Sequence, residues 1–144
     1  MKKRIILSVL IVFLFLALMG CNGGIITDES KVRNVIEEYF SAITEQNWNK
    51  AKSYCIYESD IYYETCDLEE HINDLIFQYE TVDITLEIDI FDISIYNIDY
   101  AEAYVYGTSD ISYNSASDSS DGDGHIYLQR VDNNWKIYDS FFDN

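Results

Sequence analysis

The alternation of hydrophobic and polar positions divides the chain after residue 27 into a helical half and a strand half. Over residues 30–46 the apolar side chains recur every three or four positions, which predicts a helix with one buried face. These side chains are Val32, Val35, Ile36, Tyr39, Phe40 and Ile43. Thr27 or Asp28 can cap this helix. Asn47 can cap a short second helix with one apolar face, formed by Trp48, Ala51, Tyr54 and Cys55.

A third helix is expected after a polar, tyrosine-rich connection that runs through Tyr63. Asp67 can cap this helix, and Glu70 three residues later completes a pair that resembles a capping box. Its apolar stripe consists of Leu68, Ile72, Leu75, Ile76 and Tyr79. The helical half is therefore predicted to end at a helix that starts near Asp67.

From Val82 onward the period changes to two, which is typical of half-buried strands. The phase of this first strand slips at Ile90-Phe91, where a bulge would absorb the extra residue. Residues 97–99 are expected to form a turn, and residues 100–112 a second strand. We expect a Ser/Asp/Gly loop over 114–124, then a hairpin of strands 125–131 and 135–141 across Asp132-Asn133-Asn134.

Three helices followed by four antiparallel strands predict an α+β fold, with N-terminal helices packed on a curved antiparallel four-stranded sheet. The helix over 35–51, the strand over 101–105 and the segment over 131–137 resemble, in this order, the nuclear-transport-factor-2-like superfamily of cone-shaped domains. Small bacterial lipoproteins of this superfamily carry the same three pieces. The resemblance covers about residues 28–142 and implies a fold rather than one activity.

Residues 1–20 have the pattern of an export signal. A basic start is followed by an uncharged apolar run, residues 5–19, which is shorter than a membrane-spanning helix needs. The run ends in Leu18-Met19-Gly20-Cys21, which resembles the bacterial lipobox, where the cysteine thiol receives a diacylglycerol. We therefore expect a signal peptide over 1–20, lipidation of Cys21, a tether over 21–27 and one domain over 28–144. A cleaved signal peptide without lipid is the alternative. The expected location is the outer face of a bacterial cell membrane.

Charge limits what this domain can bind. After Arg4 the chain has six Lys and Arg residues against 26 Asp and Glu residues, a net charge of −20. Such a surface cannot neutralise phosphates, which excludes nucleic acid as a partner. It also disfavours docking of the domain surface on anionic lipid, so the expected membrane contact is the lipid on Cys21.

Two cysteines and one histidine are candidates for chemistry in the helical half. Export permits a disulfide between Cys55 and Cys66, with two separate thiols as the alternative. His71 falls along the apolar stripe of the third helix, where it could face a cavity as an acid, a base or a polar contact. A hydrogen-bonded, inert histidine is the alternative. No catalytic residue, metal ligand or cofactor is predicted.

Aromatic and acidic residues are the candidates in the strand half. Tyr100, Tyr104 and Tyr106 form a stripe on one face of the second strand, which suits a homodimer interface or a ligand surface. Cross-strand pairing with other tyrosines is the alternative. The segment 118–124 carries several carboxylates, which a calcium ion needs, but their spacing departs from the EF-hand pattern, so a solvated loop is expected instead.

These observations predict a lipid-anchored extracytoplasmic domain that binds a small ligand or a protein partner and is not an enzyme. The resemblance supplies one alternative, a small enzyme of the ketosteroid-isomerase-like type that acts on an apolar substrate in the cone cavity. A third hypothesis is an interaction domain without a cavity, whose interior is filled by Trp48, Trp135 and Phe40. The polarity of the cavity distinguishes the first two hypotheses, since an enzyme needs titratable groups with displaced pKa values.

Overall fold

The computed structural model describes residues 27–79 and 81–143. The predicted signal peptide and Cys21 lie outside the described residues. Three helices precede four strands: α2 (Asp28–Thr44), α3 (Trp48–Tyr54), α4 (Asp60–Tyr79), β1 (Val82–Ile95), β2 (Tyr100–Tyr113), β3 (Ala116–Val131) and β4 (Asn134–Asp143). Within the described residues, no helix has the length and apolar character needed to cross a membrane.

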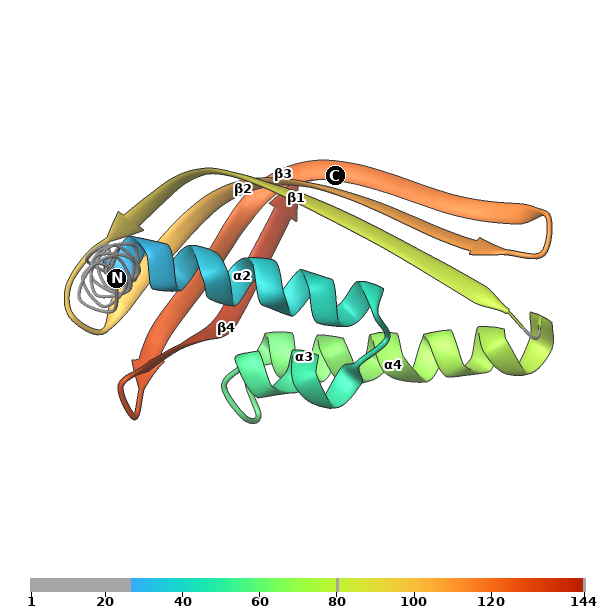
Figure 1. The fold of residues 1–144 in the computed structure, drawn as a ribbon, viewed down its shortest axis with the longest axis horizontal. Coiled ribbons are helices and arrows are strands. Elements are labelled where there is room, and N and C mark those ends of the chain that lie inside the picture. Colours follow the sequence, from blue (N-terminus) through green and yellow to red (C-terminus); the bar gives the residue numbers. More distant parts are fainter. Residues whose placement is uncertain (1–26, 80, 144) are drawn as a thin grey trace, which may run out of the picture.

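The four strands form one antiparallel sheet in the order β1-β2-β3-β4, so each strand pairs with its neighbour in the sequence. The sheet curves, and the helices lie against its concave side (Figure 1). The predicted bulge in the first strand is confirmed, since the register of β1 shifts between Ile90 and Asp92. The three-helix, four-strand α+β fold predicted from the sequence is therefore the observed one.

The core lies between α2 and the concave face of the sheet. Val32 and Ile36 of α2 are fully buried, and so are Ala103 and Val105 of β2. α2 lies closest to β1, and the small side chains of β2 are buried in the same core as larger residues of the other strands. Burial of each large aliphatic side chain contributes roughly 1.5–3 kcal/mol to the free energy of unfolding.

The third helix is longer than the sequence pattern suggested. It begins at Asp60, and Asp67 lies inside it instead of capping it. The Ser59 hydroxyl accepts a hydrogen bond from the Tyr62 amide at 3.4 Å, so the Ser59 side chain provides an acceptor for a backbone amide in the first turn of α4. The predicted tyrosine-rich connection is wrong because Ile61 and Thr65 continue the buried stripe of the helix toward its N-terminus.

The predicted Ser/Asp/Gly loop over 114–124 is also wrong. β3 begins at Ala116, and its polar first half pairs residue by residue with β2, from Tyr113↔Ala116 to Val105↔Gly124. The chain reverses within Asn114-Ser115, where Asn114 has a φ of 54°. Near the C-terminus the turn is also shorter than expected, since Val131 pairs with Asn134 and only Asp132-Asn133 connect β3 to β4.

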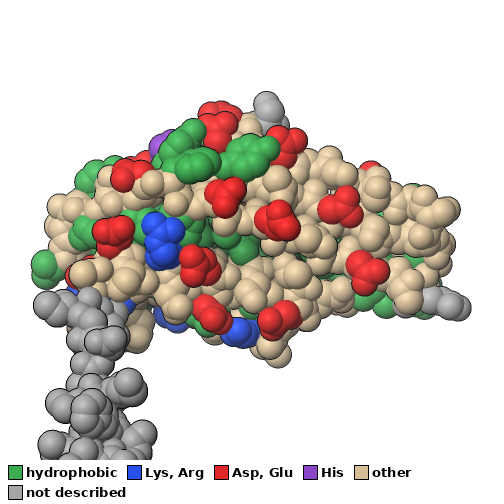
Figure 2. Space-filling view, turned by 45° about the horizontal axis from the view of Figure 1, so that its top comes forward, with side chains coloured by type: hydrophobic (Ala, Val, Ile, Leu, Met, Phe, Trp, Pro, Cys, Tyr) green, Lys and Arg blue, Asp and Glu red, His purple; other side chains and the backbone are tan. Residues whose placement is uncertain are grey.

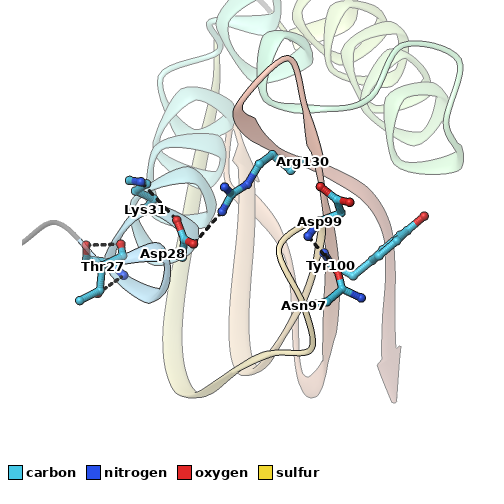
Figure 3. Close-up of polar contacts among 8 residues, drawn as sticks. Thr27, Asp28, Lys31, Asn97, Asp99, Tyr100 and Arg130 are labelled. Carbon is cyan, nitrogen blue, oxygen red and sulfur yellow. Dashed lines mark hydrogen bonds and ion pairs between the residues drawn. The ribbon is translucent and has the colours of Figure 1, made fainter.

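Polar contacts join the start of α2 to the sheet (Figure 3). The Asp28 carboxylate lies 2.7 Å from a guanidinium nitrogen of Arg130 on β3, and this pair lowers the pKa of Asp28. The backbone amide of Arg130 donates to the Asp99 carbonyl at 2.8 Å. Asn97 Oδ1 accepts from the amides of Asp99 and Tyr100, which confirms the predicted turn over 97–99. The first residues of the domain are thereby held against one end of the sheet.

Candidate functional site

A cavity of about 250 Å³ lies between α2, α4 and the concave face of the sheet. It is larger than the roughly 150 Å³ cavity that can hold benzene in other proteins, so a small organic molecule fits its size. Its walls are mostly apolar, as is usual for ligand pockets. They are formed by Tyr39, Phe40, Ile43, Ile61, Glu64, Thr65, Leu68, Leu86, Ile126, Ile137, Ser140 and Phe142.

A second hollow of about 190 Å³ adjoins this cavity. Phe40, Leu86 and Phe142 line both spaces, so these three side chains stand between them. The second hollow extends over the polar half of β2 and β3, where its lining includes Gly107 and Gly122. The concave side therefore has an apolar inner part and a more polar outer part.

A buried hydroxyl pair forms one wall of the inner cavity. Tyr39 Oη and Thr65 Oγ1 lie 2.9 Å apart, and Thr65 Oγ1 also donates to the Ile61 carbonyl at 2.7 Å. Burial raises the pKa of the Tyr39 phenol, which keeps it neutral at physiological pH. These hydroxyls satisfy one another, so the pair holds α2 against α4 and leaves the wall without charge.

Glu64 is the acidic residue in the lining of this cavity. It lies on α4 and contributes to the lining of the cavity, although Glu64 as a whole is exposed to solvent. Partial burial raises the pKa of its carboxyl group, and the negative charges of Asp139, Asp60 and Asp67 raise it further. A carboxyl at the edge of an apolar space can hydrogen-bond a polar end of a ligand, or transfer a proton to it.

The structure does not bring His71 to this cavity. His71 is exposed on α4, while Ile72 beside it is buried. The helix turns the stripe of Ile61, Thr65 and Ile72 toward the core, and His71 lies outside that stripe. The prediction that His71 lies along the apolar stripe of this helix is therefore wrong.

Both cysteines of the domain are free thiols in the structure, so the expected disulfide is not formed in it. Cys55 is buried, and its thiol lies 3.9 Å from Thr65 Oγ1. Burial raises the pKa of the Cys55 thiol to about 11. A neutral, buried thiol behaves as a small apolar side chain and is unreactive.

Tyr100, Tyr104 and Tyr106 lie on the convex face of the sheet, away from the cavity. Tyr100 and Tyr104 are exposed and Tyr106 is half-buried. They face Gln129, His125 and Asp123 across the strand pair. The two sets of candidates from the sequence, His71 and the three tyrosines, are thus not brought together.

The acidic segment 118–124 is part of β3, where successive side chains point to opposite faces. Asp118 accepts a hydrogen bond from Tyr113 at 3.1 Å, whereas Asp121 accepts one from Tyr106 at 2.7 Å on the convex face. Residues 27–79 and 81–143 contain no group of three or more His, Cys, Asp or Glu side chains placed to hold a metal ion.

The sequence analysis did not find Glu64 or Phe142 as site residues. Glu64 precedes Asp67, the expected start of the third helix, and the start of α4 had to be known before the face that Glu64 occupies could be assigned. Phe142 was visible as one of an aromatic pair near the C-terminus. The pairing of β3 with β4 shifts in register between Tyr127 and Leu128, and beyond this shift Phe142 lies opposite Gly124 on the concave side while Phe141 lies opposite His125 on the convex side.

An open antiparallel sheet curved over three helices, with a cavity on its concave side, defines an α+β cone. No family model matches the chain, and no curated protein matches it. Solved structures of similar fold include a ketosteroid isomerase-like protein from Erwinia carotovora atroseptica, with 9% identity, a TM-score of 0.57 and coverage of 77% of this chain and 91% of that chain. An NTF-2-like protein of unknown function from Shewanella oneidensis has 11% identity, a TM-score of 0.55 and coverage of 82% and 100%.

The Bdellovibrio bacteriovorus protein Bd1075 also matches, with 16% identity and a TM-score of 0.53 over 77% of this chain; the match spans 38% of that longer chain. At these identities the likeness concerns the fold. The chain has the nuclear-transport-factor-2-like fold, as the resemblance in the sequence implied.

Proposed function

We propose that this protein is a lipid-anchored extracytoplasmic binding domain that takes a small, largely apolar molecule into the concave cavity. The observation that carries the proposal is the apolar cavity of about 250 Å³ beneath the sheet. A polar end of the ligand meets Glu64, and an apolar body contacts Phe40, Leu86 and Phe142. Trp48 and Trp135 are buried in the core and do not fill this space, which disfavours the hypothesis of a domain without a cavity.

The membrane attachment in this proposal rests on the export signal and Cys21. The six residues from Asn22 to Thr27 span at most about 20 Å, so a lipid on Cys21 would keep the first turn of α2 near the membrane. Incorporation of labelled fatty acid in a bacterial host tests the anchor. We expect label in the wild type and in Cys55→Ala, and none in Cys21→Ala. Label in Cys21→Ala would contradict lipidation of Cys21.

Binding in the cavity can be tested with N-phenyl-1-naphthylamine, a neutral fluorescent probe for apolar sites. We expect saturable fluorescence enhancement with one probe per chain. Leu86→Trp fills the space between the two hollows and should weaken binding at least about tenfold. Ile98→Trp adds the same ring at a side chain that is 74% exposed and should leave binding unchanged. Equal binding by both variants would contradict a site in this cavity.

A second candidate function is favoured by Glu64. A carboxyl with a raised pKa beside an apolar cavity suits proton abstraction next to a carbonyl group, the type of reaction that a ketosteroid-isomerase-like enzyme would perform. Glu64→Gln separates this candidate from simple binding. An enzyme would convert 3-cyclohexen-1-one to the conjugated ketone, followed by ultraviolet absorbance, and would lose this activity in Glu64→Gln while probe binding persists. No conversion by the wild type would leave binding as the function.

A further inference from the structure

The convex face of the sheet carries a row of aromatic rings that runs across all four strands. Ring centroids lie 5.7 Å apart for Phe91 and Tyr104, 5.3 Å for Tyr104 and His125, 6.3 Å for His125 and Tyr127, and 6.2 Å for Tyr127 and Tyr138. We call these five residues the aromatic row. Phe91 is 62% exposed and Tyr104 is 38% exposed, so the row presents ring surface to solvent.

No helix covers this face, because the described helices lie on the concave side of the sheet (Figure 1). Three further aromatic side chains extend the open surface around the row: Tyr96, Tyr100 and Phe141. Figure 2 shows hydrophobic side chains gathered at the top of the molecule, with acidic side chains around them. An exposed apolar surface bordered by charge is typical of an interaction site.

Carboxylates fix the geometry of the row. Tyr104 Oη donates to Asp123 at 2.8 Å, and His125 Nδ1 lies 2.6 Å from Glu102 Oε1. Beside the row, Tyr106 Oη donates to Asp121 at 2.7 Å. These carboxylates raise the pKa of the Tyr104 and Tyr106 phenols, which stay neutral donors. Each carboxylate keeps lone pairs for a further donor, since an ionised carboxylate accepts several hydrogen bonds.

Lys and Arg do not neutralise this face in the described part of the chain. Four of the six such residues contact other parts of the molecule: Lys31 with Asp28, Lys50 with Glu38, Lys52 with Glu69, and Arg130 with Asp28 and the Trp135 ring. The other two lie at the borders of the face, where Arg33 donates to the Ile90 carbonyl of edge strand β1 and Lys136 of edge strand β4 donates to the Ser53 carbonyl. The face between the two edge strands therefore combines aromatic rings with the carboxylates of Asp121 and Asp123, which no Lys or Arg pairs with in the described residues.

We propose that the aromatic row and the carboxylates beside it bind a Lys/Arg-rich segment of a partner protein. Guanidinium and ammonium groups are attracted to the faces of Tyr and Phe rings, and carboxylates accept hydrogen bonds from the same groups. A second copy of this chain is a poorer match, because it would bring an equally acidic surface against Asp121, Asp123 and Glu102. This surface is separate from the cavity and does not depend on the proposed ligand.

The test measures binding of deca-arginine and deca-lysine to the full-length protein in neutral detergent at 150 mM NaCl. We expect saturable binding, with arginine favoured because its planar group stacks on rings. Phe91→Ala combined with Tyr104→Thr keeps the charge and should weaken binding about tenfold. The control, Tyr57→Ala with Tyr63→Ala, removes two exposed rings from outside the sheet and should change binding less than about twofold.

A second pair of variants separates the face from the overall charge of the protein. Asp121→Asn with Asp123→Asn removes two charges beside the aromatic row, while Glu70→Gln with Asp74→Asn removes two from the exposed side of α4. We expect about tenfold weaker binding for the first pair and less than about threefold for the second. Circular dichroism and melting temperature confirm that each variant is folded.

Three results would overturn the proposal. Equal loss in the face variants and their controls would show that binding follows net charge alone. A dimer in sedimentation velocity that dissociates in the Phe91/Tyr104 variant would assign the face to a second copy. Binding of cellohexaose that depends on Tyr104, with no binding of either peptide, would assign the rings to a neutral glycan.

Discussion

At the residue scale, Glu64 both contributes to the candidate site and has a carboxyl group whose pKa is raised. Glu64 contributes to the lining of an apolar cavity, and its partly buried carboxyl group lies near three other carboxylates; both the burial and these charges favour its protonated form. A raised pKa in the folded state means that folding takes up a proton over the window above the ordinary glutamate pKa of 4.5. The stability linked to Glu64 is therefore present at low pH and is lost as the pH rises through the pKa of the folded state.

This linkage predicts the effect of Glu64→Gln, which keeps the shape of the side chain and cannot ionise. The variant should have a higher melting temperature than the wild type at pH 7, and the difference should vanish as the pH falls toward about 4. Thermal unfolding across this range checks the prediction. Glu70→Gln, at an exposed position on the same helix, is the control and should follow the wild type. A stability difference for Glu64→Gln that does not vary with pH would argue against a raised pKa.

At the element scale, the hairpins of the sheet depend on close backbone approach. A Cβ atom on Gly124 would lie 2.2 Å from the Phe141 carbonyl oxygen, because β3 and β4 run against one another at this position. On Gly107 the nearest neighbours of a Cβ atom are Ile88 and Phe142 side-chain atoms, each 3.5 Å away. The two glycines are thus alike in chemistry and different in the space around them.

We predict that Gly124→Ala lowers the free energy of unfolding by about 2 kcal/mol or more, since β4 must move away from β3. Gly107→Ala is the matched control and should change it by no more than about 0.5 kcal/mol. Urea unfolding followed by tryptophan fluorescence measures both. Similar values for the two variants would mean that β3 and β4 adjust at no cost near Gly124.

Strand β3 shows how pairing overrides local pattern. Residues 116–123 contain a single apolar residue, Ala116, and no alternation, which is why the sequence predicted a loop there. Their partners on β2 supply an uninterrupted register, and side-chain contacts such as Ser109 with Ser120 at 2.9 Å add to the backbone hydrogen bonds. Backbone groups pair in strands whatever the side chains are, so composition alone does not identify such a segment.

At the scale of the whole molecule, charge is divided unequally between two faces. Three Lys residues pair with acidic residues of the helices, while Asp121 and Asp123 beside the aromatic row on the convex side accept hydrogen bonds from tyrosines. A net charge of −20 after Arg4 means that folding brings like charges together. Ion pairs such as Lys52 with Glu69 at 2.7 Å offset only part of this repulsion.

The melting temperature at pH 7 should therefore rise by several degrees as NaCl is raised from about 10 to about 200 mM, because the screening length falls from about 30 Å to below about 8 Å. The same series near pH 4, where many carboxylates are protonated, should show a smaller effect. Differential scanning calorimetry measures both series. A melting temperature that falls with salt at pH 7 would show that the ion pairs outweigh the repulsion.

Local periodicity in the sequence was enough to determine the number and order of helices and strands, the bulge near Ile90 and the turn over 97–99, because these features depend on neighbouring residues. The start of α4 and the strand character of 116–124 depend on partners elsewhere in the chain. The cavity is a tertiary feature in the same sense: Phe40, Glu64, Leu86 and Phe142 come from four different elements. Their meeting is set by the curvature of the sheet over the helices, which no single segment encodes.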